Sequence, residues 1–295
     1  MKKYFFYFIN LIRFILNIPL IIIIKIGNNY AKILKLIDYR NHSNFWQEIL
    51  NKSIYEFKSN KIRISKNPSK FIQFYTPSKI AGYRSKTFFS KEPETIDWLN
   101  RCGDEKKYFF DIGSNMGIYS IYYAKKFNAQ VFSFEPSYKN LEILTKNIML
   151  NSLQNNIKII SNPLSDDFKF SSFIQNDFSA GEAKASFLTN TQDKETYFKN
   201  FKDKTNEVSY NTLGLSIDNL LDLKLIPKPD LIKIDVDGNE LQIIEGLKKT
   251  LSNLSGISML IEVRKETKNE INDLMLKMGF RKTLSERDNE IWEKQ

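Results

Sequence analysis

The sequence has almost no cysteine or histidine, and both absences narrow the chemistry that the protein can perform. Among 295 residues there is one cysteine, Cys102, and one histidine, His42. A single cysteine forms no disulfide within the chain and builds no cysteine-based zinc site, so nothing indicates an oxidising compartment. Because His42 lies far before the motifs described below, a proton acceptor in a catalytic core is expected among carboxylates, lysines and tyrosines.

Positive charge is unevenly distributed along the chain. The net charge is +10, but residues 1–40 hold seven Lys or Arg and one Asp, which accounts for +6 of it. The remaining residues are close to balanced, so the sequence does not predict the broad basic surface of a nucleic-acid-binding protein. We therefore expect a small-molecule or glycan acceptor as partner and no nucleic acid.

Residues 1–27 form a basic, apolar arm. Arg13 interrupts its Phe, Ile and Leu residues, and the run Phe14–Ile24 is shorter than the roughly 20 apolar residues of a spanning helix. No small-residue cleavage site follows, which argues against a signal peptide. Three alternatives remain: a helix lying in the membrane interface, a helix packed on the body or on a second subunit, and a transmembrane anchor. We expect a cytoplasmic protein, with peripheral association at the inner face of the membrane under the first alternative.

The rest of the chain divides into an accessory region, residues 28–105, and a catalytic domain, residues 106–295. The accessory region predicts a small α+β extension with a helix at Asn44–Phe57, strands at Ile62–Ile64 and Phe71–Tyr75, and a helix from Glu92 to Arg101.

The catalytic domain shows regular alternation of strand and helix patterns from Tyr108 onward. The pattern predicts parallel βαβ units in a doubly wound, mostly parallel sheet, closed by an antiparallel strand near the C-terminus. One long helix is expected from Glu240 to about Leu251. Residues 165–215 interrupt the alternation, and we interpret them as a functional insertion or lid with one strand at Ala185–Leu188.

A glycine-containing turn ends the first strand of this domain. Asp111, Gly113, Asn115 and Gly117 alternate between the strand and the next helix, where small residues let a ligand approach the backbone. Asn115 breaks the dinucleotide fingerprint, which requires glycine at that position. Asp111 would repel a pyrophosphate, whereas it suits a cationic sulfonium. The turn therefore favours S-adenosylmethionine over a nicotinamide dinucleotide.

Two further strand ends extend the predicted site to an adenosine. Glu135 ends the second strand, and its carboxylate can accept hydrogen bonds from both ribose hydroxyls. Pro163 and Leu164 follow the third strand, where an adenine ring would lie. The nearest acids there are Asp166 and Asp167, so an acidic contact to the adenine is left open.

A cluster of charges ends the fourth and fifth strands. Lys233, Asp235 and Asp237 alternate and so point to one side while the fourth strand lasts, Glu240 follows, and Glu262 ends the fifth strand. Buried charges are costly unless they are paired or used. We predict Asp235 as the base for a hydroxyl acceptor, oriented by Lys233, with Glu262 at the same edge. Asp237 and Glu240 either contact the substrate or stabilise a strand end and a helix N-terminus.

The ordered set of these motifs resembles the FkbM-type methyltransferases over about residues 70–285. The segments that carry the resemblance are Glu92–Thr95, Phe110–Ser120, Phe134–Pro136, Lys233–Glu240 and Leu260–Val263. The resemblance implies a Rossmann-like class I methyltransferase fold, S-adenosylmethionine as methyl donor, and O-methylation of hydroxyls on sugars or secondary metabolites.

The resemblance also implies roles for individual positions. Cofactor motifs match at Asp111, Gly113, Asn115, Gly117 and Glu135, and motifs near the reacting centre match at Lys233, Asp235, Gly238, Glu240 and Glu262. Asp237 departs from the pattern, because the family commonly has glutamate there. The shorter side chain leaves its contact open.

The predicted function is O-methylation of a hydroxyl on a sugar, glycan or glycolipid-type acceptor. The alternatives are a methyltransferase acting on nucleic acid or protein, and a membrane-associated module that keeps the fold without activity. Asp235-Val-Asp-Gly238 stands where base N-methylation typically has an Asn/Asp-Pro-Pro-aromatic signature. A divalent metal held by Asp235, Asp237 or Glu262 is possible, but no metal site is predicted.

Overall fold

The computed structural model describes residues 59–65, 70–175, 185–188 and 208–295, together with Lys25, Asn29 and Gly181. The chain divides into two compact units, Met1–Lys58 and Ser59–Gln295, and the second unit contains nearly all the described residues. The predicted basic arm and the helix predicted at Asn44–Phe57 lie almost wholly outside the described residues, so both stay predictions, as do the domain boundaries at residues 27 and 105. Within the described part, no helix combines the length and apolar character needed to cross a membrane.

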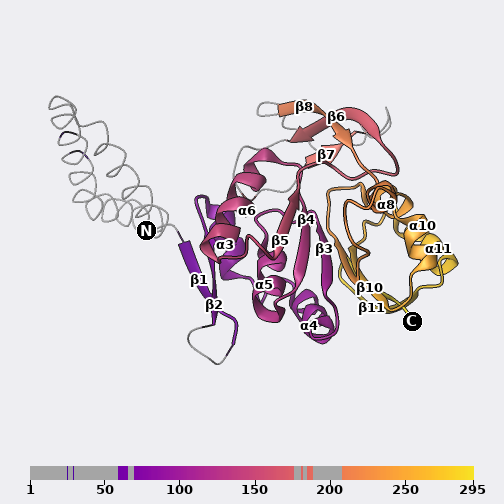
Figure 1. Ribbon diagram of the computed structural model, residues 1–295, viewed down its shortest axis with the longest axis horizontal. Helices are drawn as coiled ribbons and strands as arrows, with labels where there is room; N and C mark the ends of the chain where they lie inside the picture. Colours follow the sequence, from indigo (N-terminus) through magenta and orange to yellow (C-terminus); the bar gives the residue numbers. More distant parts are fainter. Residues whose placement is uncertain are drawn as a thin grey trace, which may run out of the picture. The chain divides into compact units, whose positions relative to one another are not determined.

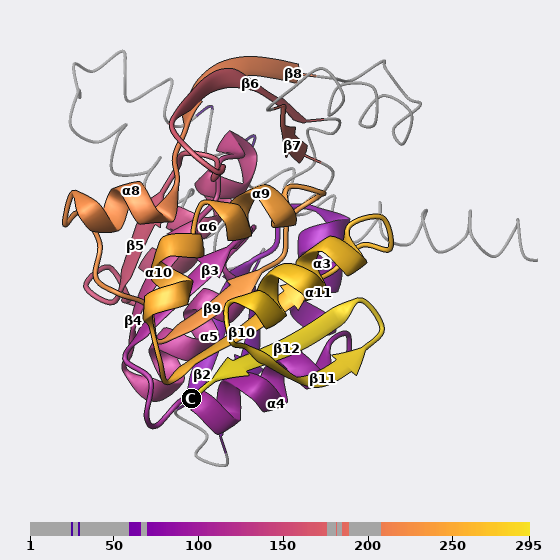
Figure 2. The ribbon, with the colours of Figure 1, turned by 90° about the vertical axis from the view of Figure 1, so that its right-hand side faces the viewer.

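A seven-stranded sheet forms the centre of the second unit. In chain order its strands are β3 (Tyr108–Ile112), β4 (Gln130–Phe134), β5 (Ile157–Ile160), β9 (Leu231–Ile234), β10 (Ile257–Glu262), β11 (Arg281–Glu286) and β12 (Asn289–Lys294). Their order across the sheet is β11-β12-β10-β9-β3-β4-β5 (Figure 1; β9 and β12 are labelled in Figure 2). The strand β12 pairs antiparallel with both β10 and β11, and all other neighbouring pairs in this sheet are parallel. This topology confirms the predicted Rossmann-like, doubly wound sheet with a closing antiparallel strand.

Helices cover both faces of this sheet. One core includes residues of α4 (Pro93–Cys102), α5 (Ile118–Phe127) and α6 (Tyr138–Leu150), and the other includes residues of α8 (Ile217–Asp222), α9 (Glu240–Glu245), α10 (Lys248–Asn253) and α11 (Lys268–Lys277). Successive strand residues divide between the cores, as Phe109 and Phe110 of β3 do. Strands buried on both faces explain the nearly continuous apolar runs in the sequence.

The N-terminal extension packs a hairpin against α6. The hairpin consists of β1 (Ser59–Arg63) and β2 (Phe71–Tyr75), and α3 (Lys79–Lys86) follows it. Two asparagines of α6 bind the β2 backbone: Asn147 Oδ1 accepts from Tyr75 N at 2.7 Å, and Asn151 Oδ1 accepts from Gln73 N at 2.9 Å. Ser78 caps α3 by accepting a hydrogen bond from the Ala81 amide.

The predicted insertion contains a second, three-stranded antiparallel sheet. It comprises β6 (Lys169–Gln175), β7 (Ala185–Phe187) and β8 (Val208–Gly214), in the order β7-β6-β8. The small sheet lies beyond the carboxyl ends of the large one, at the top of both ribbon views (Figure 2). The sequence predicted only the strand at residues 185–188. It missed β6 and β8, because their serines, threonine and asparagine hide the alternation of a half-exposed strand.

The prediction of one continuous helix from Glu240 to Leu251 is wrong. The structure has two helices there, α9 and α10, separated at Gly246. A Cβ atom at Gly246 would lie 2.1 Å from the Ser165 carbonyl oxygen, so a side chain would clash with the backbone that follows β5. The break also exposes the amides of Lys249 and Thr250, which both donate to the Asp218 carboxylate at 2.9 Å.

Candidate functional site

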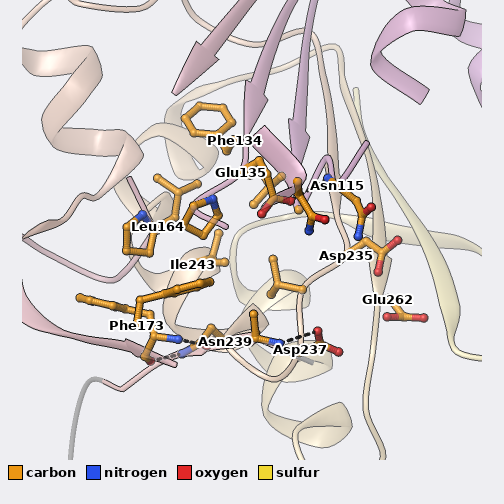
Figure 3. A pocket seen from close by; sticks show the side chains of 18 of the residues that line it. Asn115, Phe134, Glu135, Leu164, Phe173, Asp235, Asp237, Asn239, Ile243 and Glu262 are labelled. Atoms are coloured by element: carbon orange, nitrogen blue, oxygen red, sulfur yellow. Dashed lines mark hydrogen bonds between the residues drawn. The ribbon is translucent and has the colours of Figure 1, made fainter. Parts of the chain in front are cut away.

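A cavity of about 240 Å³ opens at the carboxyl ends of β3 and β9. The chain builds β4 and β5 on one side of β3 and then returns to build β9 and β10 on the other, so the cavity occupies the switch point of the sheet. Figure 3 shows an apolar end and a charged end, with two polar side chains between them. The apolar end has Phe134, Leu164, Phe173 and Ile243, the charged end has Asp235 and Glu262, and Glu135 and Asn115 lie between.

The turn after β3 owes its alternating sequence to its backbone conformation. Gly113, Asn115 and Gly117 all have positive φ, at 80°, 52° and 80°. Glycine adopts this left-handed region freely, and asparagine is one of the few other residues that tolerates it. A Cβ atom at Gly113 would lie 1.9 Å from the Asp235 carbonyl oxygen, because the turn passes close to the end of β9. Asn115 is therefore compatible with the conformation of this turn.

Glu135 lines the cavity and is held by backbone amides. The amide of Asn115 donates to Oε2 at 2.7 Å, and the amide of Ser137 donates to Oε1 at 2.8 Å. Burial raises the pKa of Glu135 to about 7, although these two amides favour the ionised form. The Asn140 side chain also hydrogen-bonds this carboxylate. The acceptor capacity that remains suits another donor, such as a ribose hydroxyl.

The predicted adenine contacts Pro163 and Leu164 also line the cavity. The end of β8 holds this segment in place, since Leu215 N donates to the Pro163 carbonyl at 2.9 Å. Asp166 and Asp167, which the structure also describes, do not line the cavity. They bind Lys169 and Asn219 instead, at 2.6 Å and 2.8 Å.

Asp111 is buried at the end of β3, just before the turn, and it is not among the residues that line the cavity. Ser120 Oγ donates to Asp111 Oδ2 at 2.5 Å and lies 2.7 Å from Ser133 Oγ. Burial raises the pKa of Asp111 above its ordinary value. Gly117 is likewise outside the lining; there a Cβ atom would lie 2.4 Å from Leu144 Cδ1. Direct contact of either residue with a cofactor stays a prediction.

Lys233 is a buried cation that positions Asp235. Its side chain is 1% exposed, its Nζ donates to Asp235 Oδ2, and the same Nζ lies 4.8 Å from the centre of the Tyr119 ring. Burial alone would lower the pKa of Lys233, but the carboxylates of Asp235 and Glu92 raise it above its ordinary value. Lys233 therefore stays charged at neutral pH.

Asp235 and Glu262 form a carboxyl pair in which the two groups titrate far apart. Burial disfavours the ionised form of Asp235, but Lys233 lowers its pKa to about 2. Burial and the charge of Asp235 raise the pKa of Glu262 to about 8. At neutral pH the pair therefore holds one proton, on Glu262, and one negative charge, on Asp235. Both side chains line the cavity, as Figure 3 shows.

Asp237 and Glu240 share Arg264 as a partner. Arg264 Nη2 donates to Asp237 Oδ1 at 3.1 Å, and its Nε lies 3.8 Å from Glu240 Oε1. Asp237 Oδ2 also accepts from the Ala185 amide of β7, at 3.2 Å. These contacts agree with the alternative that Asp237 and Glu240 stabilise the end of a strand and the start of a helix. Asp237 lines the cavity as well, so its contact with a substrate stays a prediction.

Asn239 is a residue of this edge whose role the sequence did not reveal. Its Oδ1 accepts from Ser186 Oγ at 2.9 Å, and its Nδ2 donates to the Phe187 carbonyl at 3.0 Å. The segment after β9 thus attaches β7 to the large sheet, as the dashed lines in Figure 3 indicate. The attachment places the Phe187 side chain in the lining of the cavity.

A second lobe of about 40 Å³ adjoins the charged end. It shares Arg84, Lys91, Gly113, Asn115 and Asp235 with the main cavity, and its other polar lining residues are Thr87, Glu92, Ser114, Tyr119 and Lys233. The sequence marked Glu92 only as part of a family motif and contained no signal for Arg84. Both residues reach the site because α3 and the start of α4 pack beside the turn after β3.

The charged edge does not assemble a metal-binding group in the part of the chain that the structure describes. There, no cluster of three or more His, Cys, Asp or Glu side chains is arranged to hold a metal ion. The acids considered for such a site have other partners: Lys233 for Asp235, and Arg264 for Asp237.

Most of the site lies inside the part of the chain that one protein-family model matches. The model described as "Methyltransferase FkbM domain" matches residues 111–282, more than half of the chain. This span includes the turn after β3, Glu135, and the charged ends of β9 and β10.

Two curated relatives and a solved structure were also found. "Hexuronic acid methyltransferase AglP" of Haloferax volcanii is 26% identical over 165 residues, which cover 56% of this chain and 59% of that protein. "Methyltransferase sdnD" of Sordaria araneosa is 24% identical over 206 residues, which cover 60% of this chain and 73% of that protein. The chain thus matches less than two thirds of AglP. A precorrin-6y C5,15-methyltransferase structure from Geobacter metallireducens has a TM-score of 0.41 at 13% identity, covering 69% of this chain and 87% of that one.

Proposed function

The chain belongs to the FkbM methyltransferase family, and we propose that it methylates a hydroxyl group of a sugar or glycan with S-adenosylmethionine as donor. The observation that carries the proposal is the cavity at the switch point. Glu135 lies along one wall, and the Asp235–Glu262 pair lies at the charged end. Family and fold imply the donor, and the acceptor follows from the chemistry of the charged end and from one relative.

The cavity offers, in order, an apolar surface and a hydrogen-bond acceptor, and these suit the adenine and the ribose of the donor. Leu164, Phe134 and Ile243 offer an apolar surface for an adenine ring, and Glu135 accepts hydrogen bonds from ribose hydroxyls. The amino-acid part is left for the polar surface beside the turn after β3, which Asn115 lines. When bound, S-adenosylmethionine supplies an electrophilic methyl group on a sulfonium.

The carboxyl pair serves as the base in this proposal. Ionised Asp235 alone is a weak proton acceptor because its pKa is about 2, but it can hold the acceptor hydroxyl by accepting its hydrogen bond. Glu262 has a pKa of about 8, so its ionised form is a stronger base and is populated near working pH. Lys233 keeps Asp235 in place. The pair thus orients the hydroxyl and takes up its proton.

A sugar acceptor is supported by the name of the first relative, a hexuronic acid methyltransferase. We propose a small-molecule or glycan acceptor rather than nucleic acid. Beyond residues 1–40 the chain is nearly balanced in charge, which gives little electrostatic attraction for a phosphate backbone.

The test measures methyl transfer by the full chain to methyl glucuronoside, methyl glucoside, RNA and a denatured protein mixture. We expect S-adenosylhomocysteine to form with a sugar, and the methylated sugar to survive mild alkali, as an ether does and an ester does not. Asp235→Asn should lower kcat about 100- to 10,000-fold, while S-adenosylhomocysteine still binds. Asp273→Asn, an exposed change on α11, is the control.

The pH profile separates the two carboxyl groups. Because the reactive pair must lose the Glu262 proton, kcat should rise with pH until Glu262 is ionised, and Glu262→Gln should remove this rise. Alkali-labile product would mean a carboxyl acceptor. Methyl transfer to RNA or protein alone would contradict the proposal, as would full activity of Asp235→Asn.

A further inference from the structure

An open groove of about 680 Å³ lies on the N-terminal extension, outside the cavity at the switch point. The strand β1 forms one wall, and the end of α3 with the turn that follows it forms the other. The two walls lie side by side in Figure 1, and Asn60 Nδ2 of β1 donates to Ser85 Oγ of α3 at 2.7 Å. This hydrogen bond holds the strand and the helix together along the groove.

Three cations line the groove, and no acid is found among the described residues of its lining. The cations are Lys61 and Arg63 of β1 and Lys86 of α3, and all three side chains are exposed. Lys61 and Arg63 stand two residues apart on a strand, so they point to the same side. An opening lined by charge of one sign attracts ligands of the opposite sign. The groove therefore suits an anionic ligand.

The groove differs from the second lobe of the cavity in the partners of its cations. In the lobe, Arg84 acts on Asp235 and helps to lower its pKa, and Lys91 Nζ lies 2.5 Å from Glu92 Oε1. In the groove, none of the three cations belongs to an ion pair with another described residue. The groove cations are therefore the ones that an anionic ligand can neutralise without competing with an acid of the protein.

Phe89 adds an aromatic surface to the groove. Its side chain is 45% exposed, while its ring packs edge-on against Phe88 and Tyr122, with ring centres 4.7 Å and 6.2 Å apart. An aromatic ring has a negative face, which attracts the C–H groups of a ligand such as a sugar ring. Uncharged polar side chains that can hydrogen-bond hydroxyl groups complete this part of the lining, and they include Ser59, Asn60 and Ser90.

The groove adjoins the charged end of the cavity across one short segment of chain. Residues 84–91 divide between the two openings, so that some line the groove and others line the second lobe, and Phe88 lines both. Asp235 lies in the lining of the lobe and of the main cavity. A ligand longer than one sugar ring, with a hydroxyl group at Asp235, can therefore extend over this segment to the groove.

We propose that the groove binds further residues of the acceptor, and that the acceptor is a sugar chain bearing carboxylates or other anionic groups. The inference rests on the proposed function, because it takes a sugar as the methyl acceptor. Such a chain presents anions, hydroxyl groups and the C–H faces of its rings together. The groove offers the matching set of cations, uncharged polar groups and an aromatic ring.

The experiment measures equilibrium binding of three sugars to the full chain by calorimetry: tetragalacturonate, galacturonate and the uncharged tetrasaccharide maltotetraose. The wild type should bind tetragalacturonate at least about 10-fold more tightly than either of the others at low salt. A groove variant that combines Lys61→Gln, Arg63→Gln and Lys86→Gln should weaken tetragalacturonate about 5- to 50-fold. The same variant should change the binding of galacturonate less than about 2-fold.

The aromatic contact is tested by Phe89→Ala, an exposed change. It should weaken tetragalacturonate and maltotetraose alike, by about 3- to 10-fold, because packing of a sugar ring does not depend on charge. High salt should leave this loss in place, whereas it should remove the difference between the wild type and the groove variant.

A matched control removes three positive charges from another part of the surface. Lys224→Gln, Lys228→Gln and Lys277→Gln are exposed changes, and the combined variant should bind all three sugars as the wild type does. An equal loss of tetragalacturonate in this control would overturn the proposal, because net charge alone would then explain the effect. Tighter binding of tetrauridylate or tetraglutamate than of tetragalacturonate, lost in the groove variant, would also overturn it and assign the groove to nucleic acid or to an acidic peptide.

Methyl transfer to methyl glucuronoside keeps this inference apart from the proposed function. The groove variant should keep the wild-type kcat and KM for this monosaccharide, since one sugar ring at Asp235 does not reach the groove. If the wild type methylates the monosaccharide but binds tetragalacturonate no better than galacturonate, the inference fails and the proposed function stands. If the groove binds tetragalacturonate as expected but no sugar is methylated, the proposed function fails, and with it the assignment of the groove to the acceptor.

Discussion

Glu135 and Asp235 are carboxylates at the ends of two parallel strands of one sheet, yet their environments shift their pKa values in opposite directions. Glu135 follows β4, and its partners are uncharged: the backbone amides of Asn115 and Ser137 and the side chain of Asn140. Asp235 follows β9, and its partner is the cation of Lys233. Burial disfavours both carboxylates, but only the full charge of Lys233 outweighs it, so the pKa of Glu135 rises to about 7 and that of Asp235 falls to about 2.

The difference in pKa suits Glu135 to binding a ligand and Asp235 to the methyl-transfer step. Two backbone amides orient Glu135 but neutralise it only in part, which leaves an acceptor suited to hydroxyl groups of a ligand. A buried lysine keeps Asp235 ionised and makes it a weak base, and the adjacent Glu262 then holds the proton that titrates near neutral pH. The comparison can be tested at each end of the cavity and in the helix that follows β9.

The largest effect is expected at Lys233. Lys233→Met removes the cation from between Asp235, Glu92 and Asp111, and leaves their negative charges close together in a buried site. Breaking a buried pair by removing one partner typically costs about 3–5 kcal/mol, so urea unfolding should show a loss of that size.

The control for Lys233 is Lys158→Met, at an exposed lysine of β5, which should change stability by less than about 0.5 kcal/mol. A small loss in Lys233→Met, similar to that of the control, would mean that the lysine is not the compensating charge.

A smaller effect is expected at Glu135. In Glu135→Gln the amide nitrogen would face the N–H group of Asn115 or Ser137, and the acceptor for ribose would be lost. Calorimetry should show about 10- to 100-fold weaker binding of both S-adenosylhomocysteine and methylthioadenosine, since both carry the ribose. Glu142→Gln, an exposed change on α6, should bind both ligands normally. Loss confined to S-adenosylhomocysteine would place Glu135 at the amino-acid end instead.

The smallest effect concerns the pH dependence of stability. Burial raises the pKa of Glu240 to about 7, above its value in the unfolded chain, so its stabilising contribution is complete at low pH and is lost as pH rises through 7. Glu240→Gln should reduce the fall in unfolding free energy between about pH 6 and pH 8 by about 1 kcal/mol. Glu245→Gln, at the surface end of α9, should keep the wild-type fall. An identical fall in Glu240→Gln and wild type would show that Glu240 does not titrate in this range.

Most of the large sheet was predictable because its signals are local. Apolar runs, turn residues and strand-ending acids identified all seven strands and the direction of the closing one. The small sheet was less predictable, since β6 and β8 carry polar residues on an exposed face. The break at Gly246 was missed because its cause, the Ser165 carbonyl, lies far away in the sequence.

The candidate site was predictable where its residues end strands. Parallel strands bring their carboxyl ends to one edge, so Glu135, Asp235 and Glu262 could be expected near a common cavity. Arg84 could not, because it is one of several basic residues on α3, and only the packing of that helix beside the turn brings it to the cavity.

The sequence by itself determined the topology of the sheet, the conformation of the Gly113–Gly117 turn and the edge at which the charged residues collect. These follow from strand alternation and from backbone preferences, which act over a few residues. Only the tertiary structure decided which carboxylates are charged. Ionisation depends on burial and on partners from distant segments, as in the approach of Lys233, Tyr119 and Glu92 to one buried point.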